Sequence, residues 1–260
     1  MKAALILVLA CAAGPAFSQN DQNSKTPPPI NPDRPDLTNG TGITPVGKIV
    51  LEIGYRQTGS GGMTLHEWGD GPTWRYGVGD RFELRFVSPA YAVGSIAGKG
   101  WEDSGLGFKY LLRDGGDGGG FKKPGYAIQG GTTLPTGSDA FRSKQLLPFL
   151  IGIVDFDLGA NGDLGANLGA SRQLDGNGKS FTLYSASLSY GRSLTAALTG
   201  YFEGYALVPT GIGNGSASHY VDSGLEYLLT NDCMLDASVG AQVDRHRQAS
   251  YFDVGVSFRF

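Results

Sequence analysis

The sequence is nearly devoid of cysteine, with two among 260 residues. One of them lies in an amino-terminal stretch typical of a secretory signal peptide, in which Lys2 precedes an apolar run over 3–13 and small residues stand at 16 and 18. We therefore expect residues 1–18 to be a signal peptide removed on export, which leaves Cys233 as the only cysteine. A chain with one cysteine forms no internal disulfide, so the exported protein must be stabilised by other means.

Long apolar runs are also missing. The mature sequence contains no stretch of about 20 apolar residues, the length that a transmembrane helix requires. Charged residues make up only 17%, and the net charge of -3 gives no reason to expect nucleic acid as a partner. Glycine, in contrast, is abundant at 42 of 260 residues, more than twice its usual share of about 7%. Together with 12 Tyr and 13 Phe, this composition favours a strand-rich protein with many turns.

Motifs for catalysis are absent as well. None of the three histidines, His66, His219 and His246, stands at a metal-ligand spacing from another histidine or a cysteine. The sequence has no G-x-S-x-G nucleophile motif, and its glycine-rich stretch at 115–120 lacks the Lys-Ser/Thr pair of a phosphate-binding loop. We therefore expect no catalytic residues, no metal and no cofactor, and we expect that the protein is not an enzyme.

What the sequence does contain is apolar and polar residues in alternation. The clearest example is the last segment, 251–260, in which Phe252, Val254, Val256, Phe258 and Phe260 share one face and polar or small residues share the other. Similar segments recur along the chain, with lengths near the 9–11 residues that a tilted transmembrane strand needs. The pattern predicts about twelve strands, at 47–57, 64–78, 81–88, 103–112, 125–135, 146–158, 162–171, 181–190, 193–206, 218–229, 233–243 and 251–260.

The connections between these strands alternate in length. Tight turns are expected at 79–80, 159–161, 191–192 and 230–232, and longer loops between them; the stretch 113–124 is long where a short turn is due. Outer-membrane barrels have short periplasmic turns and longer extracellular loops. We therefore predict an all-β protein of the bacterial outer membrane, a transmembrane antiparallel up-and-down β-barrel over residues 47–260 with both termini in the periplasm. Residues 19–46, rich in Pro and Asn, would form an extended leader.

A soluble alternative shows the same alternation. In a two-sheet sandwich or a small barrel with a dry core, the apolar face is the core and the polar face meets water. The long strands, polar faces rich in Gly and Ser, and a chain that ends on Phe260 favour the membrane barrel.

The charged residues on the polar faces are the candidate functional residues, because strand parity points them into the lumen. They are Glu52, Arg56, Arg75, Arg81, Glu83, Arg85 and Lys109 from the first strands, and Asp155, Asp157, Glu203, Asp222, Glu226, Asp236 and Asp253 from the later ones. A mostly basic arc would then face a mostly acidic arc, and the resulting field would order water and screen polar solutes in a channel. The same residues could instead pair and plug the barrel, because unpaired buried charges cost several kcal/mol each. Both hypotheses stay open.

Several short motifs carry a family resemblance. They are Asp33-Arg34-Pro35-Asp36, the stretch 47–55, Arg75-Tyr76-Gly77-Val78, Arg81-Phe82-Glu83-Leu84-Arg85, Leu134-Pro135-Thr136-Gly137, Asn167-Leu168-Gly169, Glu203, Asp222-Ser223-Gly224, Asp236 and Phe258-Arg259-Phe260. Their order and spacing resemble the outer-membrane transporter family labelled "Putative MetA-pathway of phenol degradation". The resemblance implies a Gram-negative outer-membrane barrel, surrounded by outer-membrane lipid and assembled by the barrel insertion machinery.

Two functions follow as hypotheses. The first is a porin-like transporter or channel for passive passage of small solutes, with hydrophobic or aromatic ones as candidates. The second is a plugged structural or interaction barrel without transport activity. In either case the segment 33–36 could fold into the periplasmic mouth, since its opposite charges could pair with charges of the lumen.

Overall fold

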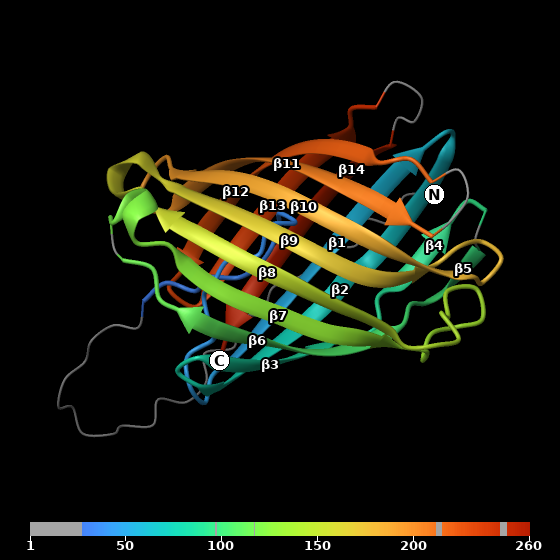
Figure 1. Cartoon of the computed structure of the whole chain (residues 1–260), viewed down its shortest axis with the longest axis horizontal. Coiled ribbons are helices and arrows are strands. Elements are labelled where there is room, and N and C mark those ends of the chain that lie inside the picture. The colour runs from blue at the N-terminus through green and yellow to red at the C-terminus, as the bar shows by residue number, and fades with distance from the viewer. Residues whose placement is uncertain (1–27, 97, 117, 212–214, 245–248) are drawn as a thin grey trace, which may run out of the picture.

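The chain forms a closed antiparallel β-barrel (Figure 1). This computed structural model describes residues 28–96, 98–116, 118–211, 215–244 and 249–260. The expected signal peptide, the first part of the leader at 19–27 and His246 lie outside the described residues. No helix within the described ranges is long and apolar enough to cross a membrane.

Twelve strands make up the barrel wall, and β1 closes it by pairing with both β2 and β14. The strands are β1 (Ile49–Ser60), β2 (Met63–Gly79), β3 (Phe82–Val87), β6 (Ser104–Arg113), β7 (Gly125–Leu134), β8 (Leu147–Asp157), β9 (Asp163–Leu174), β10 (Ser180–Ser193), β11 (Leu198–Thr210), β12 (Ser218–Thr230), β13 (Cys233–Gln242) and β14 (Ala249–Arg259). Each pairs with its neighbours along the chain, as an up-and-down barrel requires. The predicted fold and strand count are confirmed.

Two further short strands arise where only a loop was predicted. The hairpin of β4 (Tyr91–Gly94) and β5 (Gly98–Trp101) extends the wall beside β2. The rings of Tyr91 and Trp101 pack edge to face with centroids 5.1 Å apart, which holds the two strands together. This hairpin escaped prediction because its strands are too short to show a clear alternation.

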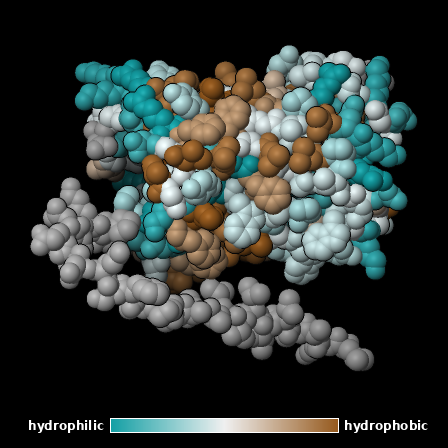
Figure 2. Space-filling view, turned by 90° about the horizontal axis from the view of Figure 1, so that it is seen from below, coloured by the Kyte–Doolittle hydropathy of each residue, from teal (hydrophilic) through white to brown (hydrophobic). Residues whose placement is uncertain are grey.

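The alternation in the sequence separates two surfaces of the wall. On β14, Phe252 and Val254 are exposed on the outside, whereas Asp253 and Ser257 are fully buried on the inside. Figure 2 shows one outer side of the barrel, where hydrophobic side chains gather across the middle and hydrophilic ones at both ends. An apolar band between two polar rims is what a lipid bilayer requires of a barrel.

The two ends of the barrel differ. At the end that we call the turn end, short connections join β2 to β3 and β12 to β13, and the chain finishes there at Phe260. The 3₁₀ helices η1 (Gly120–Lys122) and η2 (Gly159–Asn161) lie in the turn-end connections of β6–β7 and β8–β9. The opposite end, which we call the loop end, carries the hairpin β4–β5, the tight β1–β2 turn and the connections 135–146 and 175–179, whereas the long β6–β7 connection lies at the turn end. One predicted turn was wrong: residues 191–192 continue β10, and the turn comes after Ser193, where Leu194 donates to Leu198.

The leader lies inside the barrel. We call residues 28–46 the inner leader. It begins at the turn end, where Ile30 N donates to Asn231 O at 2.8 Å, and Arg259 donates to Pro28 O at 2.8 Å. It ends at Val46, which bridges to Gly77 of β2 just before β1 begins. The inner leader therefore enters the lumen and returns to the same end of the barrel (Figure 1, dark blue).

Candidate functional site

A cluster of six charged side chains joins the inner leader to strands β1, β2, β3 and β6. Arg75 donates to Glu52 Oε1 at 2.7 Å and to Glu83 Oε1 at 3.0 Å. Asp33 of the leader accepts from Lys109 Nζ at 2.7 Å and from Arg85. Together with Glu52 and Glu83, it supplies three negative charges against the three positive charges of Arg75, Arg85 and Lys109. We call this group the Asp33 cluster; it is buried and electrically balanced.

A second cluster surrounds the guanidinium of Arg34 in the leader. Arg34 pairs with Asp70 at 2.7 Å, with Asp236 at 3.2 Å and with Asp253. Arg56 shares two of these partners, Asp253 at 2.8 Å and Asp70 at 3.6 Å. Neighbouring residues of the leader are thus held by adjacent parts of the wall, Asp33 by basic residues of β2, β3 and β6 and Arg34 by carboxylates of β2, β13 and β14.

Glycines on the inner wall make room for Arg34. Gly54 of β1 and Gly255 of β14 stand opposite each other in the strand register. A Cβ at Gly255 would lie 2.5 Å from Nε and from Nη2 of Arg34, and no other group comes as near. A side chain at position 255 would therefore displace the guanidinium of Arg34. Because glycine has no side chain, the inner leader can lie against the wall at this position.

Asp70 reaches Arg34 because β2 bulges inward. The register between β1 and β2 shifts between Glu52 and Gly54, so that residues between Gly69 and Thr73 have no partners in β1. Gly69 and Gly71 have φ of 106° and 61°, and Asp70 itself has φ of 45°, a region that non-glycine residues rarely adopt. Asp70 was not among the predicted lumen residues; the Gly-Asp-Gly-Pro stretch inside an alternating segment was the available signal of a bulge.

Hydrogen bonds hold the rest of the inner leader. Carboxylates of the wall accept from its backbone: Glu203 from Leu37 N at 2.8 Å, Asp155 from Thr41 N at 2.6 Å and Glu83 from Thr44 N at 2.8 Å. Two apolar contacts add to these bonds: Ile30 packs against Val50 and Met234, and Ile43 packs against the cluster of Leu111, Ala127 and Ile153. Between these two apolar anchors the leader is attached by polar contacts, which water can replace.

The two carboxylates of the motif at 33–36 occupy opposite electrostatic environments. Burial raises the pKa of Asp33, but Arg75, Lys109 and Arg85 more than compensate, so its pKa lies well below the usual range. Burial and the neighbouring Glu203 hold the pKa of Asp36 well above its ordinary value. We call the position of the inner leader inside the barrel its seated state. A negative charge on Asp33 therefore stabilises the seated state, and a negative charge on Asp36 destabilises it.

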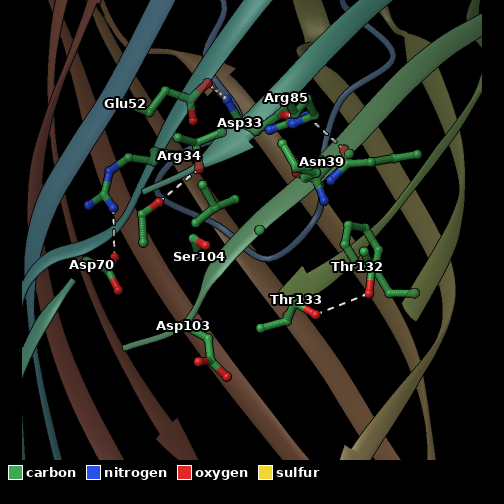
Figure 3. Close-up of a pocket in the computed structure, with 18 of the residues that line it drawn as sticks. Asp33, Arg34, Asn39, Glu52, Asp70, Arg85, Asp103, Ser104, Thr132 and Thr133 are labelled. Carbon is green, nitrogen blue, oxygen red and sulfur yellow. Dashed lines mark hydrogen bonds and ion pairs between the residues drawn. The ribbon is translucent and has the colours of Figure 1, made fainter. Parts of the chain in front are cut away.

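Cavities remain on both sides of the leader. The loop-end cavity has a volume of about 330 Å³ and is bordered by Arg56, Asp70, Gln129 and Phe149, among others. Figure 3 shows how Asp33 and Arg34 of the leader lie among Glu52, Asp70 and Arg85 of the wall beside this cavity. The turn-end cavity, of about 580 Å³, is lined by residues from β8–β12. Arg34 and Asp36 border both cavities, so this short segment of the leader lies between them.

The structure places most of the predicted lumen residues inside the barrel. Those that face the interior are Glu52, Arg56, Arg75, Glu83, Arg85, Lys109, Asp155, Glu203, Asp222, Glu226, Asp236 and Asp253. Two predicted positions require correction. Arg81 lies in the β2–β3 turn, where its side chain is 55% exposed and 3.9 Å from Asp114, because β3 begins only at Phe82. Asp157 is exposed at the end of β8 and accepts from Gly118 N and Gly159 N, so it stabilises turns at the rim.

A closed barrel with an apolar outer band and a charged, polar interior defines a transmembrane barrel protein of the bacterial outer membrane. The chain belongs to the family described as "Putative MetA-pathway of phenol degradation", whose model matches residues 32–260. No curated protein sequence matches the chain.

Several solved structures share the fold. The COG4313 outer membrane channel from Pseudomonas putida F1 is 14% identical, with a TM-score of 0.61, over 89% of this chain and 100% of that one. The NanC porin is 13% identical, with a TM-score of 0.53, over 80% and 98%. The KdgM porin, solved in complex with disordered oligogalacturonate, is 13% identical, with a TM-score of 0.52, over 81% and 99%. These neighbours are porins and channels, and at such identities they establish the fold of this chain.

Proposed function

We propose that the protein is an outer-membrane channel through which small solutes pass passively when the inner leader moves away from the wall. The observation that carries this proposal is the position of residues 34–36 between two cavities, in a seat made of ion pairs and hydrogen bonds. With the leader seated the channel is closed, and with the leader displaced the two cavities join. In this arrangement the turn end faces the periplasm, and the barrel insertion machinery places the protein in the outer membrane.

The proposed solutes are small and hydrophobic or aromatic. The loop-end cavity, at about 330 Å³, falls at the small end of ligand pockets, which span about 300–1,000 Å³. Its border includes Phe149 and Val87 beside the polar groups, so a single-ring molecule with one polar substituent would find both kinds of contact. The description of the family, which names phenol degradation, supports the same class.

A plugged barrel without transport is the second candidate. The balance of three positive and three negative charges in the Asp33 cluster favours it, because a fully paired cluster satisfies groups that would otherwise be costly to bury. A plug of this kind would stabilise the barrel and would never leave its seat.

Gly255→Ala separates the two functions, because the three atoms nearest to the added methyl group all belong to the guanidinium of Arg34. Gly204→Ala is the matched control: it adds the same methyl group to β11, where the nearest heavy atom would be 3.9 Å away. The measurement is single-channel recording in planar lipid bilayers, with heat resistance of the folded barrel on gels as the test of folding.

For a channel, we expect brief openings in the wild type and in Gly204→Ala, and a much larger open fraction in Gly255→Ala. Permeation of phenol into liposomes that contain the protein should rise in the same order. A Gly255→Ala protein that is folded, less heat-resistant and silent would establish the plug and overturn the channel.

A further inference from the structure

The outer wall of the barrel is hollowed by an apolar groove over β8–β11, with a volume of about 450 Å³. Leu150, Leu168, Tyr184 and Val208 border the groove and are between 40% and 71% exposed. Their side chains belong to the outward faces of their strands, so the groove lies on the side of the wall that faces lipid.

Small residues form the floor of the groove. Gly152 of β8 stands opposite Leu168 of β9, which in turn stands opposite Ala186 of β10. A Cβ at Gly152 would have its nearest heavy atom at 3.9 Å, so the space above this residue is open. At the next level towards the loop end, Ala170 stands opposite Tyr184. Large side chains at the borders and small ones on the floor therefore make this part of the wall concave.

The groove extends across four neighbouring strands (Figure 1, yellow to orange). Neighbouring strands lie about 4.8 Å apart, so four of them span roughly 14 Å. One extended hydrocarbon chain is much narrower than that. The groove is therefore wide enough for more than one chain of a lipid.

A basic side chain stands at the loop-end border of the groove. Arg172 follows Ala170 by two residues on β9, so both side chains point outward from the same strand. Arg172 is exposed, donates to Ser180 Oγ at 2.5 Å and makes no ion pair with any residue in the described ranges. Thr182 and Thr210 stand beside it in the strand register and add hydroxyl groups at the same level.

The neighbouring loops add positive charge at this end. The β7–β8 and β9–β10 connections border a common cavity of about 540 Å³, so they lie side by side. Lys144 belongs to the first connection and Lys179 to the second, and neither makes an ion pair within the part of the chain that the structure describes. Two carboxylates of these loops have other partners: Asp139 pairs with Arg142, and Asp175 accepts from backbone N–H groups of its own turn.

An apolar groove that ends at basic groups and hydroxyls matches a lipid with a phosphorylated head group. Arginine binds phosphate through its planar fork, and basic clusters beside a membrane-embedded surface recognise anionic lipid heads. With the turn end in the periplasm, the groove faces the outer leaflet of the outer membrane. The lipid of that leaflet is a glycolipid with several acyl chains and with phosphate groups on its sugars, so it fits the groove in width and the rim in charge.

We propose that this groove and the basic groups of Arg172, Lys144 and Lys179 bind one molecule of lipopolysaccharide, the phosphorylated glycolipid of the outer leaflet. Acyl chains of its lipid A part lie over Gly152 and Ala170, and Arg172 binds one of its phosphates. The inference rests on the orientation given for the proposed function, and it holds whether or not the leader leaves its seat.

Two pairs of variants test the site. Gly152→Leu fills the floor of the groove, and Gly204→Leu is its control: Gly204 is opposite the exposed Leu188, outside the groove, and a Cβ there would also have its nearest heavy atom at 3.9 Å. Arg172→Gln removes the charge at the rim, and Arg192→Gln makes the same change at an exposed position near the turn end of β10. Lipid A bound to the folded full chain in detergent is measured by native mass spectrometry, with heat resistance on gels as the test of folding.

We expect the wild type, Gly204→Leu and Arg192→Gln to retain one molecule of lipid A. Arg172→Gln should weaken binding about fivefold, the effect of one basic group at an anionic lipid surface, and Gly152→Leu should weaken it at least as much. Lipid A without its phosphates should bind weakly and should not distinguish the wild type from Arg172→Gln. Binding that Arg172→Gln or Gly152→Leu leaves unchanged, or equal binding of phosphatidylglycerol, would overturn the site. The measurement requires no conduction, so its result is separate from that of the channel recordings.

Discussion

Asp33→Asn is the most direct perturbation of the leader's seat. The Asp33 carboxylate bonds to Lys109 at 2.7 and 2.8 Å and pairs with Arg85, and Arg75 lies 3.8 Å away. Asparagine keeps the shape and one acceptor oxygen but removes the charge. The Asp33 cluster would change from three negative and three positive charges to two and three, which leaves one buried positive charge without a partner.

The expected cost follows from that imbalance. Breaking a buried ion pair by removing one partner costs about 3–5 kcal/mol, and we take the lower end because asparagine still accepts a hydrogen bond. Since 1.4 kcal/mol corresponds to a factor of ten, the ratio of displaced to seated leader should rise by roughly 100-fold. In planar bilayers this appears as a similar increase in the ratio of open to closed time.

Asp36→Asn is the matched control, because it removes the same kind of charge three residues further along the leader. Asp36 lies beside Glu203 rather than beside a basic group, so its replacement relieves repulsion. We expect the open fraction of Asp36→Asn at neutral pH to be equal to or lower than that of the wild type. Equal increases in both variants, or no change in Asp33→Asn, would refute the idea that charge pairing holds the leader.

Three further predictions follow from the same contacts. Lys109→Met combined with Asp33→Asn should recover much of the closed state, because two negative and two positive charges remain; a double variant as open as Asp33→Asn alone would contradict this balance. Asp70→Asn should raise the open fraction with little effect on heat resistance, since Arg34 keeps its ion pairs with Asp236 and Asp253. A loss of heat resistance without a change in the open fraction would mean that the bulge only supports β2. The open fraction should also depend on pH. Because the pKa of Asp36 is raised in the seated state, its contribution to seating is present in acid and is lost as the pH rises through that raised pKa. The contribution of Asp33, whose pKa is lowered, is present above its ordinary pKa of about 3.9 and is lost only as the pH falls below that value. Openings should therefore become rarer as the pH is lowered from neutral towards about 4, and this trend should be weaker in Asp36→Asn.

The wall of the barrel could be predicted because its signal is local. In β14, the alternation of Phe252 and Val254 with Asp253 assigns each side chain to lipid or lumen without reference to any other strand. The same parity placed Glu203 and Lys109 inside correctly. It failed for Arg81 because parity holds only within a strand, and the β2–β3 turn ends after that residue.

The partners of those side chains could not be predicted in the same way. Asp33 meets Lys109 and Arg34 meets Asp253 across separations of 76 and 219 residues, and no periodicity relates them. Asp70 was missed because a bulge, which breaks the alternation, is what turns it inward.

The sequence by itself therefore determined the barrel, its number of wall strands, and a lumen with basic residues early and acidic residues late. These features follow from the alternation of apolar and polar side chains at every second residue and from the lengths of the connections. The membrane imposes the alternation on each strand separately. Only the tertiary structure decided that the leader occupies the lumen between the two arcs. Its polar, aperiodic sequence has no preferred structure alone, and its conformation comes from charges and glycines that the closed barrel brings together.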